Sequence, residues 1–127
     1  MRSSMVIALV LLAIVLAGGT FMALRAAEVS EMFTDAAQDL RGFVLAGQWE
    51  EAVRRLTAYR LAWEELLPGL QMQIDHEATD DVTLALEHIA AGLESRSLPL
   101  ALLGCRNLRE SASHLHHRDA FTWANIL

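Results

Sequence analysis

An uninterrupted apolar run near the amino terminus constrains this chain more than any other feature. The run, Met5 to Leu24, reads MVIALVLLAIVLAGGTFMAL, and Arg2 is the only charged side chain before it. A bilayer core of roughly 30 Å needs about 20 apolar residues at a rise of 1.5 Å per residue. A helix also satisfies its own backbone hydrogen bonds, as lipid requires. The run therefore predicts a transmembrane anchor, residues 1–25, followed by a separate domain, residues 26–127.

A cleaved secretory signal is the alternative interpretation of the run. Met5 to Leu16 would form its apolar region, and Ala17-Gly18-Gly19 offers a small-residue cleavage site. However, Thr20 to Leu24 continues the apolar run beyond that site, whereas a signal's apolar region spans about 7–15 residues. This overshoot favours an uncleaved anchor, and both interpretations carry the rest of the chain across the membrane.

The orientation of the anchor is indicated only by its short amino-terminal tail. Arg2 and Arg25 flank the run, so the positive charges on its two sides are nearly balanced, and acidic residues contribute little to orientation. A very short tail with nothing to hold it outside favours an amino terminus on the cytoplasmic side. We therefore expect a single-pass cell-membrane protein whose bulk is extracytoplasmic.

The composition of the remaining chain excludes some classes of function. All 16 Asp and Glu residues follow the apolar run, and the net charge is −6. Nucleic-acid binding needs a basic footprint, which this acidic chain lacks. Cys105 is the single cysteine, so an internal disulfide and a multi-cysteine metal site are excluded. It lies on an apolar stripe with Leu108 and Ala112, which predicts a buried, unreactive thiol.

Apolar residues after the run recur at spacings of three and four, which indicates helices throughout. The expected helices are residues 28–46, 48–67, 70–93 and 99–122. Gly47 suits the position that ends a helix, Pro68-Gly69 is expected to stop the second helix, and Ser97 is a candidate N-cap ahead of Pro99. Short connections make consecutive helices antiparallel neighbours. The predicted fold is all-α: a transmembrane helix, followed by an up-down antiparallel four-helix bundle.

The first two bundle helices have clear apolar faces, which predict their core residues. The first helix can continue directly from the anchor, because nothing between Leu24 and Glu28 breaks it. The expected core positions are Val29, Met32, Phe33, Ala36, Leu40, Phe43 and Val44 in the first helix, and Trp49, Ala52, Val53, Leu56, Tyr59, Trp63, Leu66 and Leu67 in the second.

The histidines are the first candidates for chemistry. His114, His116 and His117 lie in one short stretch, and His114 and His117 could approach a metal ion from one helix face. A third ligand at matching spacing is missing, so the pattern is weak for zinc. Histidines at a helix end also interact favourably with its carbonyl groups. We expect no metal and no cofactor.

The segment around His76 is the second candidate. Its sequence, His-Glu-Ala-Thr-Asp, shares a first half with the HExxH zinc motif but lacks the second histidine. Ile74 and Ala78 take the core side of the expected helix, which turns His76 away from the core. A solvated helix face is therefore favoured over a catalytic pair.

The tryptophans and the chain end are candidates for an interaction or ligand surface. Trp49 and Trp63 stand fourteen residues apart, two heptads, which favours core positions, although they could line a ligand groove. The chain ends in an apolar segment that contains Trp123, Ile126 and Leu127. Such an end packs on the bundle, on lipid or on a partner. We expect Trp123 to lie near residues 25–29.

Two resemblances follow from these residues. Ala46 to Ala52 is similar to the start of a tetratricopeptide helix, but it occurs once and without a 34-residue period. The chain also resembles a bacterial family of unknown function, through the ordered pattern Trp49, Trp63, Ile74-Asp75-His76-Glu77 and Asn125-Ile126-Leu127. The resemblance implies a small single-span protein with a helical extracytoplasmic region and a membrane protein as partner. It implies no catalytic residues.

The leading expectation is a non-enzymatic interaction module for another envelope or membrane protein. The chain has no nucleophile elbow, phosphate-binding loop or paired-cysteine motif that would indicate an enzyme. A ligand-sensing bundle with a pocket near Trp49 and Trp63 is the alternative, and a histidine-dependent metal protein is the third possibility.

Overall fold

The chain folds into four helices joined by short connections. The computed structural model describes the backbone of residues 2–126 and the side chains of these residues other than 23 and 116–126. The helices are α1 (Arg2–Leu45), α2 (Trp49–Gln71), α3 (His76–Glu94) and α4 (Leu98–Ile126). The predicted all-α class is confirmed for the described residues. The expected helix 28–46 is the second half of α1, which continues unbroken from the apolar run.

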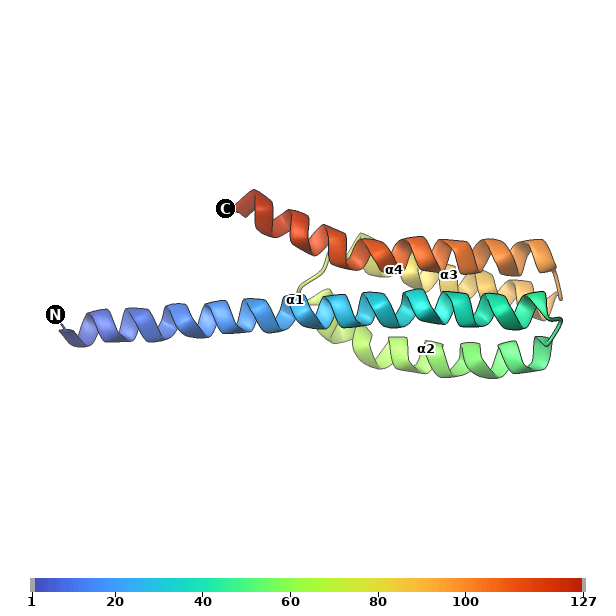
Figure 1. Cartoon of the computed structure of the whole chain (residues 1–127), viewed down its shortest axis with the longest axis horizontal. Helices are drawn as coiled ribbons and strands as arrows, with labels where there is room; N and C mark the ends of the chain where they lie inside the picture. The colour runs from blue at the N-terminus through green and yellow to red at the C-terminus, as the bar shows by residue number, and fades with distance from the viewer. Residues whose placement is uncertain (1, 127) are drawn as a thin grey trace.

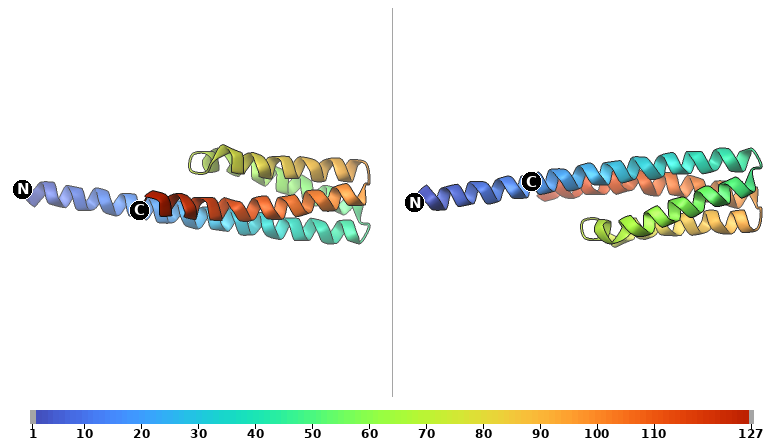
Figure 2. Two further views of the ribbon diagram at one scale, coloured as in Figure 1. Left: turned by 90° about the horizontal axis from the view of Figure 1, so that it is seen from above. Right: turned by 90° about the horizontal axis from the view of Figure 1, so that it is seen from below.

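Consecutive helices run in opposite directions and pack side by side as a bundle (Figure 1). Helix α1 contacts α2 and α4, and α3 contacts the same two helices. The connections α1–α2 and α3–α4 lie together at one end, which we call the far end. At the opposite, near end, α1 projects alone beyond the other helices, and α4 ends on the same side as this projection (Figure 2).

The two connections at the far end share one backbone motif. Gly47 has φ 72°, and the N–H of Gln48 donates to the Phe43 carbonyl at 2.9 Å while that of Gly47 donates to Val44 at 3.0 Å. These paired bonds define a Schellman motif, as expected for a glycine that follows a helix. After α3 the same motif recurs with Arg96, at φ 50°, in the left-handed position.

The predicted boundary between the second and third helices is wrong. Helix α2 continues through Pro68 to Gln71, and α3 begins at His76 instead of residue 70. Pro68 removes one backbone donor and strains a helix interior, but Leu70 beyond it is 2% exposed, so packing holds the extra turn in place. The new helix starts where Asp75 can cap it: its carboxylate accepts a bond from the N–H of Glu77 at 3.1 Å.

The start of α4 agrees with the sequence. The Ser97 hydroxyl accepts a hydrogen bond from the Leu100 N–H at 3.3 Å, which makes Ser97 the N-cap, and Pro99 lies in the first turn, where its missing donor costs little. The helix runs to Ile126 and is therefore longer than predicted at its carboxyl end.

Small residues bring α4 close to both of its neighbours. A Cβ atom at Gly104 would lie 2.8 Å from the Ile89 backbone nitrogen, and one at Gly92 would lie 2.5 Å from that of Ala101. On the α1 side, the buried Ser30 hydroxyl donates to the Ala112 carbonyl at 2.7 Å. Helix backbones approach this closely only where side chains are small, so these residues set the α3–α4 and α1–α4 spacing.

Large aromatic residues hold α2 against the bundle. The Trp63 ring meets Phe33 of α1 edge to face, with centroids 5.2 Å apart, and its Nε1 donates to the Thr83 hydroxyl of α3 at 2.9 Å. Trp63 is 2% exposed, so its predicted core position is confirmed. Two other predicted core residues are wrong: Met32 is 44% and Val53 is 45% exposed, because the actual helix contacts bury a narrower face than the apolar pattern suggests.

Candidate functional site

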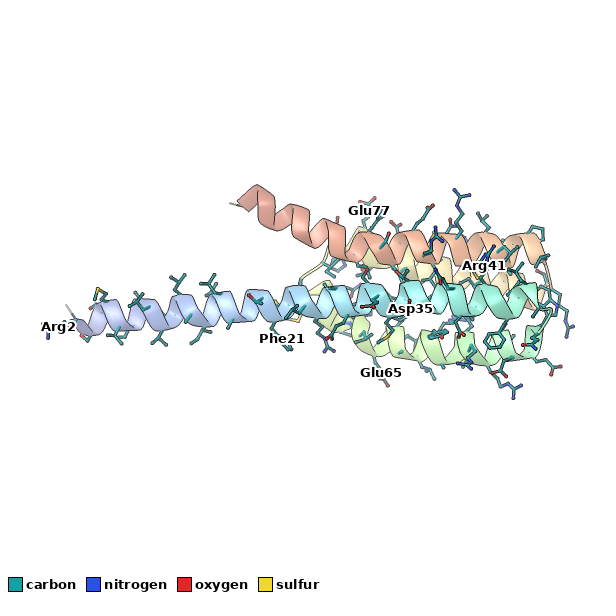
Figure 3. All side chains as sticks on the ribbon, in the orientation of Figure 1. Arg2, Phe21, Asp35, Arg41, Glu65 and Glu77 are labelled. Carbon is teal, nitrogen blue, oxygen red and sulfur yellow. The ribbon has the colours of Figure 1, made fainter. Side chains whose placement is uncertain are left out.

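The apolar run forms the exposed part of α1. Figure 3 shows Arg2 and Phe21 on the section of the helix that projects from the bundle. From Met5 to Leu24 the described large apolar side chains are exposed, and the first buried residue is Ala26. Among the described residues, α1 is the one helix apolar and long enough to cross a membrane.

A second surface feature is an open groove between α1 and α4, with a volume of about 660 Å³. It is lined by Ala37, Gln38, Arg41 and Gly42 of α1 and by Leu102, Cys105, Arg106 and Arg109 of α4. Ala37 and Cys105 are buried and form its floor together with the half-buried Leu102. We call this feature the basic groove. Arg41, labelled in Figure 3, places it in the half of the bundle toward the far end.

The arginines of the basic groove have little counter-charge. Within the part of the chain that the structure describes, neither Arg41 nor Arg109 forms an ion pair. Arg106 approaches Glu110 at 3.4 Å, but both side chains are more than half exposed. Such an exposed pair contributes little because water screens it. Three guanidinium groups therefore stand beside an apolar floor on a chain of net charge −6.

Gly42 leaves the wall of the groove open. A Cβ atom built on it would meet nothing within 4 Å, in contrast to Gly104, where it would clash with Ile89. A glycine inside a helix costs about 1 kcal/mol relative to alanine. Neither packing nor backbone conformation explains Gly42, and its main structural consequence is the space above it.

On the other flank of α1, which faces α2, side chains fill the surface and opposite charges are paired. The Tyr59 hydroxyl donates to Asp39 Oδ2 at 2.6 Å, and Arg55 lies 3.8 Å from the same oxygen. Arg55 also stacks over the Phe43 ring at 5.2 Å and pairs with Glu51 at 3.3 Å. Burial, followed by the hydrogen bond to Asp39, raises the pKa of Tyr59 to about 12.

Cys105 in the groove floor is a buried thiol, as predicted. Removal from water disfavours the thiolate and raises the pKa of Cys105 to about 11, although the nearby Arg41 acts in the opposite direction. The thiol is therefore protonated at neutral pH, and Cys105 contributes apolar surface to the groove.

Of the residues that the sequence proposed as a surface, the three with described side chains, Trp49, Trp63 and His76, do not come together. Trp63 is enclosed by the core and offers no face to a partner, whereas Trp49 is half-buried at the far end. There Trp49, Arg54 and Arg96 line an open hollow of about 550 Å³. His76 is exposed at the first turn of α3, at the near end, as the orientation of Ile74 and Ala78 predicted.

The histidine cluster and the chain end lie largely outside the described side chains. His116, His117, Trp123 and Ile126 fall within helix α4, but their side chains are outside the described residues, and so is Leu127 altogether. The expected position of Trp123 near residues 25–29 therefore stays a prediction. Within the described residues, no three His, Cys, Asp or Glu side chains are arranged to hold a metal ion.

The sequence reasoning missed the arginines of the basic groove. Arg106 and Arg109 are one turn apart on a single helix, but Arg41 is far away in the sequence and joins them only through the α1–α4 contact. Two signals were present: the pair of arginines beside the Cys105 stripe, and a glycine within an otherwise regular helix.

A comparison with protein families assigns the chain to one family. The model described as Domain of unknown function (DUF4363) matches residues 22–126. The chain belongs to this family. The match spans the whole bundle and begins at the end of the apolar run, and it confirms the expected membership of a family of unknown function. Neither among curated proteins nor among solved structures was a match found.

Proposed function

We propose that this member of the family is a single-pass membrane protein whose bundle is an extracytoplasmic, non-enzymatic docking module for another envelope or membrane protein. The observation that carries the proposal is the apolar run of α1. Its described large apolar side chains are exposed along about 30 Å of helix, a length that matches a bilayer core. Burial of this surface in lipid would remove the largest unfavourable contact with water.

The organisation of the bundle supports this anchoring. Helix α1 enters the bundle without a break, so an anchor and an up-down bundle would form one rigid unit. The family match begins at residue 22, close to Ala26, the first buried residue of α1. Helix α4 ends at the near end, which would bring the apolar chain end close to the membrane surface (Figure 1). Tryptophan is a favoured residue at that interface.

The docking role is supported by the surface of the bundle, and a pocket for a sensed ligand is not. The alternative needs an enclosed pocket near Trp49 and Trp63, but the Trp63 ring fills its site between Phe33 and Thr83, and the hollow beside Trp49 is open. The hollow beside Trp49 and the basic groove are both open, and the groove combines an apolar floor with arginines that have little counter-charge. This combination is typical of a surface that another protein covers.

The orientation can be tested in sealed spheroplasts that carry the full chain. We expect added protease to degrade the bundle, because residues 26–127 face outward, while a cytoplasmic marker protein stays intact. Complete protection of the bundle would overturn the orientation. A mature chain that begins near Thr20 would show that the apolar run is a cleaved signal.

The docking role can be tested by crosslinking in intact membranes. A photoreactive residue is placed in turn at Gln38, Leu61 and Leu84, which are exposed positions on α1, α2 and α3. We expect at least one position to capture a single membrane or envelope protein reproducibly. The absence of a protein adduct from every position would contradict the docking role.

A further inference from the structure

We propose that the basic groove binds an acidic, amphipathic helical segment of the partner protein. The segment would present carboxylates to Arg41, Arg106 and Arg109 and an apolar side to Leu102. This inference rests on the proposed docking function and specifies its surface and the chemistry of the partner.

Charge is the first argument for this occupant. The chain carries a net charge of −6, yet among the described residues two arginines of the groove have no ion pair and the third has only an exposed one. On the opposite flank of α1, Arg55 is paired with both Asp39 and Glu51. Carboxylates of a partner protein would form ion pairs with Arg41 and Arg109, which have none among the described residues. Hydrogen bonds between charged, partly desolvated groups are strong.

The shape of the groove favours a helix over a small anion. The groove follows the line of contact between two antiparallel helices, and its floor is apolar. Arg106 and Arg109 are separated by about 4.5 Å along α4. A helical partner repeats its side chains at about the same interval, so carboxylates one turn apart could meet successive arginines.

The membrane itself is a poor alternative source of negative charge. Arg41 lies 17 positions after Leu24 on the same continuous helix, which corresponds to about 25 Å. This distance exceeds the Debye length of about 8 Å at physiological ionic strength, so headgroups at the end of the apolar run are screened from the groove.

Binding can be measured with the full chain in nanodiscs of zwitterionic lipid. The probe is a labelled amphipathic peptide with leucines on one face and glutamates on the other, and its matched control has glutamine in place of every glutamate. We expect the acidic probe to bind, and the glutamine peptide to bind about tenfold more weakly or less. Equal binding of the two peptides, or no binding of either, would overturn the proposal.

Matched variants locate that binding. Arg41→Gln with Arg109→Gln removes the two unpaired charges of the groove, whereas Arg54→Gln with Arg60→Gln makes the same change in net charge on exposed positions of α2. We expect the first pair to weaken the acidic probe about tenfold and the second pair to change it less than about twofold. Equal losses for both pairs would show only a general charge effect and would overturn the groove.

A second variant tests the groove by shape. Gly42→Leu fills the open wall, and Gly69→Leu makes the same change at another helical glycine with free space around it. Because Gly42 has no close neighbour and leucine is the better helix former, we expect Gly42→Leu to keep or raise the melting temperature and to abolish probe binding. Gly69→Leu should leave binding unchanged. Undiminished binding by the folded Gly42→Leu chain would contradict the proposal.

Crosslinking separates failure of the groove from failure of the docking function. A protein adduct at Gln38 that is lost in the Arg41→Gln, Arg109→Gln chain, and whose crosslinked peptide is an acidic helical segment, would support the groove. Adducts at Leu61 or Leu84 alone would keep the docking function and reject the groove. A lipid adduct or a second copy of this chain at Gln38 would also reject it, and no adduct anywhere would reject both.

Discussion

Helix α1 has two flanks that are built differently. Toward α2 it meets large side chains, and the Tyr59–Asp39–Arg55 contacts close the surface above them. Toward α4 it meets small residues such as Ala112, the backbones lie close together, and the surface above them is the basic groove. The first flank satisfies its own charges, whereas the second leaves Arg41 exposed.

The difference shows that close packing of two helices does not by itself cover or neutralise the surface above their contact. Small residues bring α4 into close contact with α1 and with α3, but they are too small to cover the helix edges and carry no counter-charge. Around α2 the aromatic residues keep the helices further apart and also supply polar groups that neutralise the edge. We therefore expect the α2 flank to matter for stability alone, and the α4 flank to serve both stability and binding.

The largest expected effect lies on the α2 flank. Trp63→Ala removes the ring between Phe33 and Thr83 and should lower the free energy of unfolding by about 3–5 kcal/mol. Trp63→Phe is the matched control and should lose less, because it keeps a six-membered ring in the site and removes only three ring atoms and one hydrogen bond of about 1 kcal/mol. Thermal and denaturant unfolding of the two variants would measure the difference. An unchanged melting temperature for Trp63→Ala would contradict the comparison.

The next effect concerns the close approach of α4. In Gly104→Ala the new methyl group must displace the Ile89 backbone, which should cost about 1–3 kcal/mol. Denaturant unfolding would measure this loss. A neutral result would mean that α3 and α4 can separate freely, and the small residues would then not set the spacing of the helices.

A third prediction concerns the polar contact that closes the α2 flank. Tyr59→Phe should lower the free energy of unfolding by about 1–1.5 kcal/mol at neutral pH, the value of one hydrogen bond to a partly exposed charge. Because the pKa of Tyr59 is raised from 10.0 to about 12 in the folded chain, its stabilisation is fully present below pH 10 and declines as the pH rises from 10 to 12.

The titration of Tyr59 can be followed directly, because it is the single tyrosine of the chain. Tyrosinate absorbance should show a midpoint near pH 12 in the folded protein, and the loss of stability above pH 10 should be smaller in Tyr59→Phe. A midpoint near pH 10 would show that the bond to Asp39 does not persist in solution.

The smallest expected effect has the opposite sign. Gly42→Ala should raise the free energy of unfolding by about 0.5–1 kcal/mol, because Gly42 has open space around it and alanine is the better helix former. Gly104→Ala in the same unfolding assay is the comparison: packing requires a glycine at position 104, whereas it does not at position 42. A destabilised Gly42→Ala chain would assign Gly42 a structural role.

The elements that the sequence predicts correctly are those that depend on local chemistry. The helix through the charge-free run, the Gly47 end of α1 and the Ser97 cap of α4 follow from the properties of a few adjacent residues. The burial of Trp63 and Cys105 follows from apolar periodicity, since each lies at the centre of a stripe rather than at its margin.

The errors occur where long-range packing outweighs local preference. Pro68 indicates a helix end, but the burial of Leu70 holds the helix together past it. Met32 and Val53 lie at the margins of apolar stripes, and only the actual positions of the neighbouring helices decide that they face solvent.

The basic groove depends both on local sequence and on long-range packing. Arg41, Gly42 and Arg109 are each visible in the sequence, and helical periodicity places each on a particular face of its own helix. Their meeting depends on the register of α1 against α4, which is set by close backbone contact and by the bond from Ser30 to Ala112. Local residues dictate helices and caps because those interactions span a few positions. A site shared by two helices exists only after packing has fixed their relative positions.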